Sequence, residues 1–393
     1  RQNGKSATID ASLRERRLNI SFKGELDLGN LRPALRYPGP LHGSLRGDYR
    51  LSMNISPFRF LESQGVMRVD DLDLPPAIGS PYVRVDRIHL QGQGENISLH
   101  ELRLQLNNRP IDLTGSVDIT ADNNILDLKL RAGELGLKWL KTVQDMGNGG
   151  ENAANMEQLS RIRGTVDLEI DAFRLGEIEA KPVQGIVEIS GNKTTVLIKE
   201  VGLCDLDPLG RVVFQKNRTS AELSAHVRKQ RLDRTVACLG GDEGLISGEF
   251  ALSLRTRAKG ETPSELKKNT RGNFQFQAQN GRIYRINTLS KILALLNASE
   301  ILFGNLPDLQ KEGFGYNAID AKGNIKGQKL RLKEAIIDGK SLKIAANGDI
   351  DFSKMQMDMI VLVSPLKTVD RIISWIPVVN YILQDTLVTI PFR

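Results

Sequence analysis

The chain has 393 residues, of which 40% are hydrophobic and only 5% aromatic, and its formal net charge is +7. Aliphatic side chains must therefore supply most of the buried surface, which suits a long shallow sheet better than a compact core built around aromatic residues. Lys and Arg are spread along the chain, without basic patches interleaved with aromatics or a known reader motif, so nucleic acid is not expected as a partner. An anionic membrane surface or anionic lipid headgroups are compatible with the charge.

Apolar runs in the sequence are short. None reaches the roughly 18 uninterrupted residues that a membrane-spanning helix needs, so we expect any membrane anchor to lie outside this segment. The sequence starts at Arg1 without a methionine, and we expect it to be part of a longer protein. The most apolar run, residues 372–383, is interpreted as a helix end followed by a strand, with an interfacial membrane contact as the alternative.

Strand-like alternation begins near the start of the chain. Apolar residues occupy every second position from Leu18 to Leu28, which is typical of a strand with one wet face. Similar alternation runs from Val83 to Leu106, but its phase slips by one residue at several places, and such slips predict bulges or turns inside a meander. Residues 111–119 and 126–132 continue the pattern.

A segment rich in Gly and Asn, residues 147–160, interrupts this pattern and has the composition of a flexible linker. It predicts a domain boundary. We therefore expect a β-rich segment over residues 1–146, a linker or loop over 147–160 and a second β-rich segment over 161–393.

Alternation resumes after that segment, at residues 164–170, 219–227, 246–254, 272–278 and 342–352. The spacing allows on the order of 20 to 30 strands in the chain. A twisted sheet of more than about ten strands must split, curl or extend. The sequence therefore predicts a mainly β fold with an elongated antiparallel sheet rather than one closed sandwich or small barrel.

Two short amphipathic helices are expected in the second half, near residues 288–297 and 366–374. In the first, Thr288 is a candidate N-cap, and Ile292, Leu295 and Leu296 share the side that should face the sheet. The Asn280-Gly281 pair just before it predicts a turn that ends the preceding strand.

A short phrase recurs along the chain: Gly, any residue, an aliphatic residue, Asp, then an apolar residue. It starts at Gly24, Gly115, Gly164 and Gly348. In a strand, the Gly and both apolar residues share one face and the Asp points to the other. The phrase is interpreted as structural, with chance recurrence in a β-rich chain as the alternative.

The sequence contains no recognisable catalytic or metal-binding motif. The four histidines, His42, His89, His100 and His226, lack the spacing of a metal site and are expected on strand surfaces. The stretch from Gly339 resembles the end of a phosphate-binding loop but lacks the first glycine. We therefore expect no catalytic residue, no metal and no cofactor, and a protein that is not an enzyme.

The two cysteines, Cys204 and Cys238, could form one disulfide if the compartment is oxidising. The alternative is two buried, unreactive thiols. We predict the disulfide.

The segment from Gly248 to Phe392 resembles the C-terminal region of the AsmA-like proteins, envelope proteins of Gram-negative bacteria. The residues that carry the resemblance are the strand 272–278, residues 280–283 leading into 289–297, and the motifs 313–316, 338–342, 348–351, 363–368 and 376–377. The first half shares only the strand pattern and the Gly-Asp phrase. The motifs are architectural and carry no catalytic signature.

The resemblance implies a protein anchored in the inner membrane by a segment outside this chain and facing the periplasm. It further implies a long curved sheet, similar to those of bridge-like lipid transfer proteins, that forms a hydrophobic groove for phospholipid acyl chains between the inner and outer membranes. Such a protein would support lipid homeostasis of the outer membrane.

Seven residues on alternating strands are predicted to line this groove: Leu223, Ala225, Phe250, Leu252, Ile344, Met357 and Met359. The alternative is a structural or assembly factor for outer-membrane proteins, in which the apolar face is an ordinary core or a surface for envelope protein partners. An enzyme acting on envelope lipids or glycans lacks any candidate set of residues.

Overall fold

The computed structural model describes residues 6–31, 42–55, 58–74, 83–119, 124–136, 161–215, 218–242, 244–284, 313–340, 342–365 and 389–392. Within these ranges it has 21 strands, two short α-helices and one 3-10 helix, so the prediction of a mainly β fold is confirmed. The chain divides into two compact units. Unit 1 comprises residues 1–201 with 213–216, and unit 2 comprises residues 202–212 with 217–393.

Unit 1 holds the first twelve strands and the 3-10 helix η1 (Leu28–Leu31). The strands are β1 (Ala7–Arg14), β2 (Arg17–Asp27), β3 (His42–Ile55), β4 (Phe58–Leu74), β5 (Val83–Gly94), β6 (Asn96–Leu106), β7 (Arg109–Ile119), β8 (Asn124–Gly136), β9 (Ile162–Leu175), β10 (Ile178–Ala180), β11 (Val183–Ser190) and β12 (Lys193–Val201). From β1 to β8 each strand pairs antiparallel with the next. Strand β8 pairs parallel with β9, which pairs antiparallel with β10 and β11, and β11 pairs antiparallel with β12.

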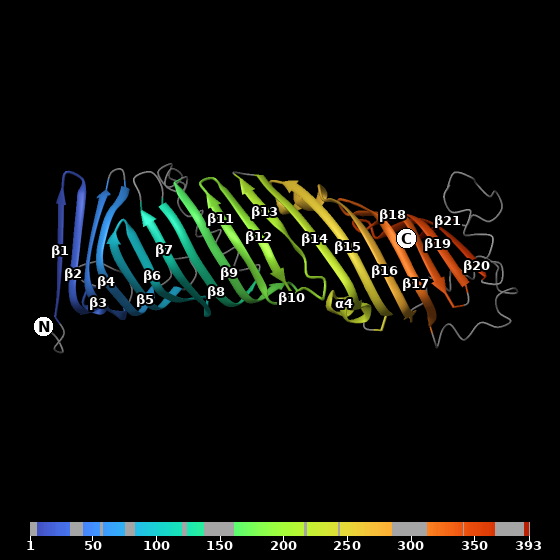
Figure 1. Ribbon diagram of the computed structural model, residues 1–393, viewed down its shortest axis with the longest axis horizontal. Coiled ribbons are helices and arrows are strands. Elements are labelled where there is room, and N and C mark those ends of the chain that lie inside the picture. The colour runs from blue at the N-terminus through green and yellow to red at the C-terminus, as the bar shows by residue number, and fades with distance from the viewer. Residues whose placement is uncertain are drawn as a thin grey trace. The chain divides into compact units, whose positions relative to one another are not determined.

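Unit 2 is an antiparallel meander (Figure 1). Its strands are β14 (Arg218–Arg231), β15 (Ile246–Gly260), β16 (Arg271–Ile283), β17 (Phe314–Lys326), β18 (Lys329–Gly339), β19 (Leu342–Asp351), β20 (Gln356–Pro365) and β21 (Thr389–Phe392). Each pairs with the next. Strand β13 (Leu209–Gln215) has residues in both units.

Two short helices accompany the strands of unit 2. Helix α4 (Leu232–Cys238) follows β14, and α5 (Pro263–Lys268) joins β15 to β16. The start of α5 is a capping box: the backbone N–H of Glu265 donates to the Thr262 hydroxyl at 3.2 Å, and the Glu265 carboxylate accepts from the backbone N–H of Glu261 at 3.0 Å. Pro263 at the first helical position adds to this start signal.

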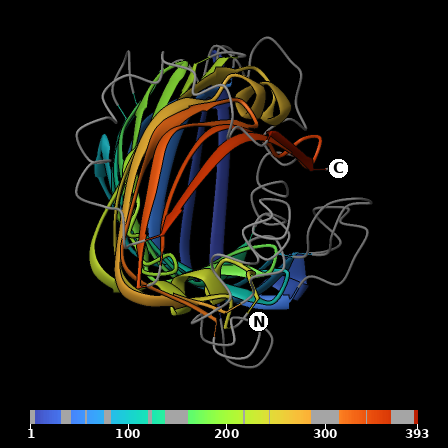
Figure 2. The ribbon, with the colours of Figure 1, turned by 90° about the vertical axis from the view of Figure 1, so that its right-hand side faces the viewer.

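The strands of unit 2 bow along their length. Figure 2 shows those from yellow to red curving so that the sheet has a concave side, with α5 in gold on that side. Helix α5 also packs on β15, because a Cβ atom added at Gly260 would meet Glu265 and Leu266. Gly260 pairs with Thr219, which shares a face with Leu223, so the concave side carries the aliphatic residues.

The recurring Gly-Asp phrase has a physical cause. Its four glycines all have positive φ angles: +118° at Gly24, +135° at Gly115, +132° at Gly164 and +146° at Gly348. At each of them a Cβ atom would collide with a backbone carbonyl oxygen of the segment alongside. The phrase therefore marks places where two strands approach too closely for a side chain.

Three expectations about local structure have different outcomes. The phase slips between Val83 and Leu106 correspond to register shifts in the β5–β6 pairing, as predicted. The prediction of a turn at Asn280-Gly281 is wrong, because β16 continues as far as Ile283. Asn280 has a φ angle of +52° and lies beside a register shift in the β15–β16 pairing. A positive-φ residue next to a bulge bends a strand without ending it.

The predicted linker over residues 147–160 lies outside the described residues, as do the predicted helices at 288–297 and 366–374 with Ile292, Leu295 and Leu296. The strands on either side of the linker, β8 and β9, pair within unit 1, and the division between compact units falls near Val201 instead. Pairing of distant segments, which local composition does not report, decides this division. Among the described residues, no helix is long and apolar enough to cross a membrane.

Candidate functional site: the apolar face of the sheet

The hydrogen-bond register of unit 2 aligns its aliphatic side chains in rows that run across the strands. Directly paired residues of antiparallel strands point to the same side of the sheet. Two rows near the α4 end are Phe250, Ala278, Ile319, Ile337, Ile344 and Val363, and Val227, Leu252, Phe276, Ala321, Ala335, Ala346 and Val361. Two further rows are Ala225, Leu254, Phe274, Gly323, Leu332, Gly348 and Met359, and Leu223, Thr256, Gly272, Ile325, Leu330, Ile350 and Met357.

These four rows define the apolar face of unit 2. Their members include no charged residue, and Thr256 supplies their one hydroxyl group. From β14 to β20 the face extends roughly 29 Å across the strands at the usual strand spacing of about 4.8 Å. All seven residues predicted to line a groove lie on this face, because the register places each of them in one of the four rows.

One end of the apolar face is closed by protein. Phe250 and Ile344 are 3% and 4% exposed and belong to a packed cluster with Leu232 of α4, Phe314 and Tyr316. The Tyr316 hydroxyl donates to the Ser247 carbonyl at 2.6 Å, and burial raises the pKa of Tyr316 to about 12. Phe250 and Ile344 therefore pack against other side chains and leave little surface for a ligand.

A disulfide reinforces the closed end. Cys204 and Cys238 are bonded, with their Cα atoms 5.5 Å apart, which is the pairing that the sequence predicted. Cys238 ends α4, and Cys204 lies in the segment before β13 that also carries Leu206. Leu206 and Val236 of α4 both pack against the cluster around Phe250. The bond therefore holds two covering segments over the same end of the face.

The other end of the face is more open. Leu223 is 37% exposed, and Leu252, Met357 and Met359 are half-buried, although all are large and apolar. Ala225 is buried, as a small side chain between larger neighbours would be. Within the apolar face, the more exposed side chains thus lie toward the Leu223 row, away from α4.

Unit 1 has an apolar face of the same kind. One of its rows crosses ten strands: Leu26, Leu45, Val69, Ile88, Leu102, Leu113, Leu130, Leu168, Gly185 and Ile198. Its buried side chains form two smaller clusters, one around Leu135 and one of Leu28 with Val69. Most residues of the row are only half-buried. Both units therefore present amphipathic single sheets.

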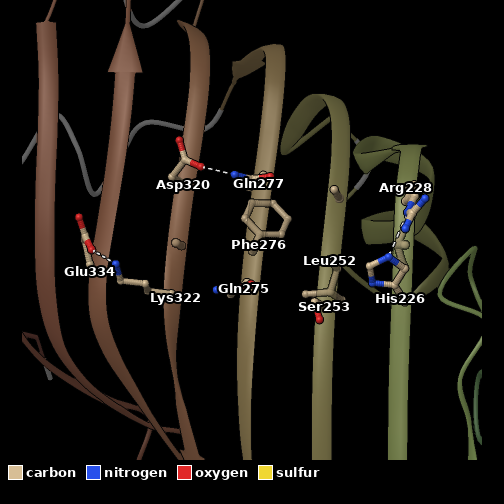
Figure 3. A pocket seen from close by; sticks show the side chains of 13 residues that line it. His226, Arg228, Leu252, Ser253, Gln275, Phe276, Gln277, Asp320, Lys322 and Glu334 are labelled. Carbon is tan, nitrogen blue, oxygen red and sulfur yellow. Dashed lines mark hydrogen bonds and ion pairs between the residues drawn. The ribbon is translucent and has the colours of Figure 1, made fainter.

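The opposite face of unit 2 is polar over β14 to β18, where it contains a shallow hollow of about 500 Å³. On β20 the same face exposes Ile360 and Leu362. Figure 3 shows the charged groups of the hollow meeting one another: Lys322 forms an ion pair with Glu334, and Arg228 Nε donates to His226 Nε2 at 3.0 Å. Gln277 likewise donates to Asp320 at 2.7 Å. Because these polar groups bond to one another, this hollow does not define a ligand site.

The histidines lie on strands, as expected, and His226 and His100 are exposed. The rings of His89 and His100 are 4.8 Å apart on β5 and β6. Partial burial, together with Arg68 and His100, lowers the pKa of His89. Across the part of the chain that the structure describes, no three His, Cys, Asp or Glu side chains gather as metal ligands would.

Fold and site together define a class: an amphipathic β-sheet protein in which, among the described residues, the concave aliphatic face of unit 2 is covered at the α4 end. The family model described as YhdP protein matches residues 83–384, and the chain therefore belongs to the YhdP family. This family is related to the AsmA-like lipid transport proteins of the envelope, which supports in broad form the resemblance found in the sequence. Among curated proteins, no sequence matches the chain.

Proposed function

We propose that the chain is the periplasmic part of a lipid transfer protein that shields phospholipid acyl chains on its apolar face between the inner and outer membranes. The observation that carries the proposal is the row structure of unit 2, in which uncharged side chains follow one another across seven strands. Each acyl methylene removed from water by such a surface gains about 0.8 kcal/mol. The chain itself would perform no chemistry.

The direction of the rows supports transfer rather than simple storage. They run perpendicular to the strands, so an acyl chain moving along a row keeps meeting aliphatic side chains as it passes from strand to strand. Its headgroup would stay beyond the strand ends, in water. Exposed apolar patches above a few hundred Å² are rare in proteins without a ligand or partner for them.

Photo-crosslinking tests the proposal. A photoreactive residue at Leu223, Leu252 or Met357, on the apolar face, should form phospholipid adducts in envelope preparations. Matched probes at the next residue of each strand, Ser224, Ser253 and Asp358, point to the polar face and should not. Adducts only to protein at the apolar positions would contradict the proposal and favour an assembly factor for outer-membrane proteins.

A further inference from the structure

A row of basic side chains crosses the polar face of unit 2 close to one end of its strands. Arg257 of β15 pairs directly with Arg271 of β16, and Arg271 pairs directly with Lys326 of β17. Lys326 in turn lies opposite Lys329 of β18. Like charges directly opposite each other destabilise an antiparallel sheet. Four basic residues on four consecutive strands therefore reduce the stability of the sheet, and strand pairing gives no reason for their presence.

Among the described residues, carboxylates neutralise the row only at Lys329. Lys329 has an ion pair with Asp351 at 3.4 Å, but none within 4 Å joins Arg257, Arg271 or Lys326 to a described carboxylate. Glu222 lies opposite Arg257 in the register, yet its carboxylate binds Arg211 at 2.9 Å instead. Arg257, Arg271 and Lys326 are all exposed, so their charged groups are accessible to an anion in solution.

More basic groups lie on the concave side of the same strand ends. Helix α5 packs over Gly260 and exposes Lys267 and Lys268. The helix also adjoins the β17–β18 hairpin, since the N–H of Gly327 donates to the Thr270 carbonyl at 2.7 Å. Of the acidic residues in this connection, Glu265 uses its carboxylate to accept from the backbone N–H of Glu261 at the start of α5. The strand ends are thus bordered by cations on both sides of the sheet.

The basic row and the open end of the apolar face are adjacent in the chain. Arg257 follows Thr256, Arg271 precedes Gly272, and Lys326 follows Ile325, and these three neighbours belong to the Leu223 row. Successive residues of a strand point to opposite faces, and a long Arg or Lys side chain near a strand end can reach the edge of the sheet. A lipid lying on the Leu223 row would therefore place its headgroup beside these cations.

We propose that Arg257, Arg271 and Lys326, with Lys267 and Lys268 of α5, bind the phosphate group of anionic glycerophospholipid headgroups at this edge of unit 2. The inference rests on the proposed function and deepens it, because it assigns a preference among lipids. Arginine binds phosphate oxygens in a bidentate manner, and lysine adds a point charge. A headgroup with net negative charge would gain more from the row than one whose phosphate is balanced by its own amine.

Binding of short-chain lipids to the whole chain tests this by isothermal titration at low salt. The probes are dihexanoylphosphatidylglycerol, dihexanoylphosphatidylcholine and sn-glycerol 3-phosphate, which separate an anionic lipid, a zwitterionic lipid and a free phosphate. The test variant is R257Q/R271Q/K326Q. The control variant R14Q/K193Q/K340Q removes the same charge from exposed positions outside the row.

We expect the test variant to weaken binding of the phosphatidylglycerol probe by on the order of tenfold or more, as basic groups near anionic lipid do. Binding of the phosphatidylcholine probe should change little, and the control variant should behave as the wild type. R257K/R271K, which keeps the charges, should retain most of the affinity. Glycerol phosphate should bind much more weakly than the lipid, because it lacks the acyl chains that occupy the apolar face.

Each failure has a distinct meaning. Equal loss of affinity in the test and control variants, or no loss in either, overturns the headgroup site and leaves the proposed function standing. If neither lipid binds the wild type, the proposed function fails as well. Tight binding of free glycerol phosphate would mean a phosphate site unrelated to lipid. The test variant should fold, with an unchanged or higher melting temperature, because it removes like-charge pairs; a lower melting temperature would show that the row stabilises the sheet.

Discussion

The two units build the same amphipathic sheet but treat the charges of their polar faces differently. In unit 1 basic residues also stand opposite one another, as Arg87 and Arg103 do, but carboxylates pair with them. Arg46 binds Asp70 at 2.8 Å, Asp70 binds Arg87 at 3.1 Å, and Arg87 meets Glu101 at 3.6 Å. Arg103, on the same strand as Glu101, in turn binds Asp112 of β7 at 2.8 Å. Near the strand ends of unit 2, the corresponding neighbours Arg257, Arg271 and Lys326 all have one sign.

The packing of the two units differs as well. Unit 2 has one larger buried cluster around Phe250 and Tyr316, covered by α4 and tied by the disulfide, whereas unit 1 has two smaller clusters. Both units form cross-strand ion pairs, for example between Arg331 and Asp349 of unit 2 at 2.8 Å, but unit 2 concentrates its packing in one core. Such a core can tolerate a row of unpaired cations, which makes those cations available for binding.

The largest expected effect comes from the core of unit 2. Phe250→Asp places an unpaired carboxylate in the packed cluster and should destabilise unit 2 by more than about 4 kcal/mol. Leu223→Asp, on the same face but 37% exposed, should cost less than about 1 kcal/mol. Urea denaturation followed by circular dichroism measures both. Similar losses for the two variants would show that the face is a closed core along its whole length.

The disulfide should account for the next largest effect, again confined to unit 2. Cys204→Ser with Cys238→Ser opens a loop with a sequence separation of 34 residues, and the chain-entropy model assigns about 3 to 4 kcal/mol to a closure of that size. Limited proteolysis with and without reductant should show faster cleavage in unit 2 and unchanged cleavage in unit 1. Equal acceleration in both units would contradict the division drawn here.

A smaller loss is expected at Tyr316. Tyr316→Phe keeps the ring in the cluster but leaves the Ser247 carbonyl without the 2.6 Å hydrogen bond, which should cost about 1 to 2 kcal/mol. The comparison variant is Tyr49→Phe in unit 1, where the ring is also buried. Burial raises the pKa of Tyr49, and a hydrogen bond with Ser63 acts to lower it. The stability that Tyr49→Phe loses should therefore be at most comparable with the loss in Tyr316→Phe. Thermal unfolding of the two variants ranks these contacts.

The smallest effect concerns the ion pairs of unit 1. Partial burial acts to raise the pKa of Asp70, but hydrogen bonds from Arg87 and Arg46 outweigh it and hold the pKa below its ordinary value. The carboxylate therefore adds stability above its unfolded pKa of about 4, and this contribution is lost as the pH falls through the lower folded value.

Asp70→Asn should reduce the stability of unit 1 by about 1 kcal/mol or less at pH 7 and by less at pH 3. Added salt should shrink the difference further. Melting temperatures of wild type and variant at the two pH values measure it. A loss that stays constant with pH would mean that Asp70 acts through packing rather than charge.

Much of the fold follows from periods that are local to the sequence. Alternation at Leu18–Leu28 or residues 246–254 is visible because a strand turns each successive side chain to the opposite face, whatever its partners are. The same property identified all seven groove candidates as apolar-face residues. The start of α5 could also have been predicted, since Thr262, Pro263 and Glu265 form the pattern of a capping box. The sequence analysis did not predict this helix.

What only the tertiary structure decided is which residues stand beside one another across strands. Register depends on hairpin turns and on bulges such as the one near Asn280, and a shift of one residue would exchange the two faces. Arg257, Arg271 and Lys326 are separated along the chain and form a row only because β15, β16 and β17 pair as they do. The same holds for α4 over Phe250 and for the meeting of β8 with β9. The sequence by itself determined an amphipathic sheet, and long-range pairing determined where that sheet is closed, open and charged, because hydrogen-bond partners far apart in the chain leave no local periodicity.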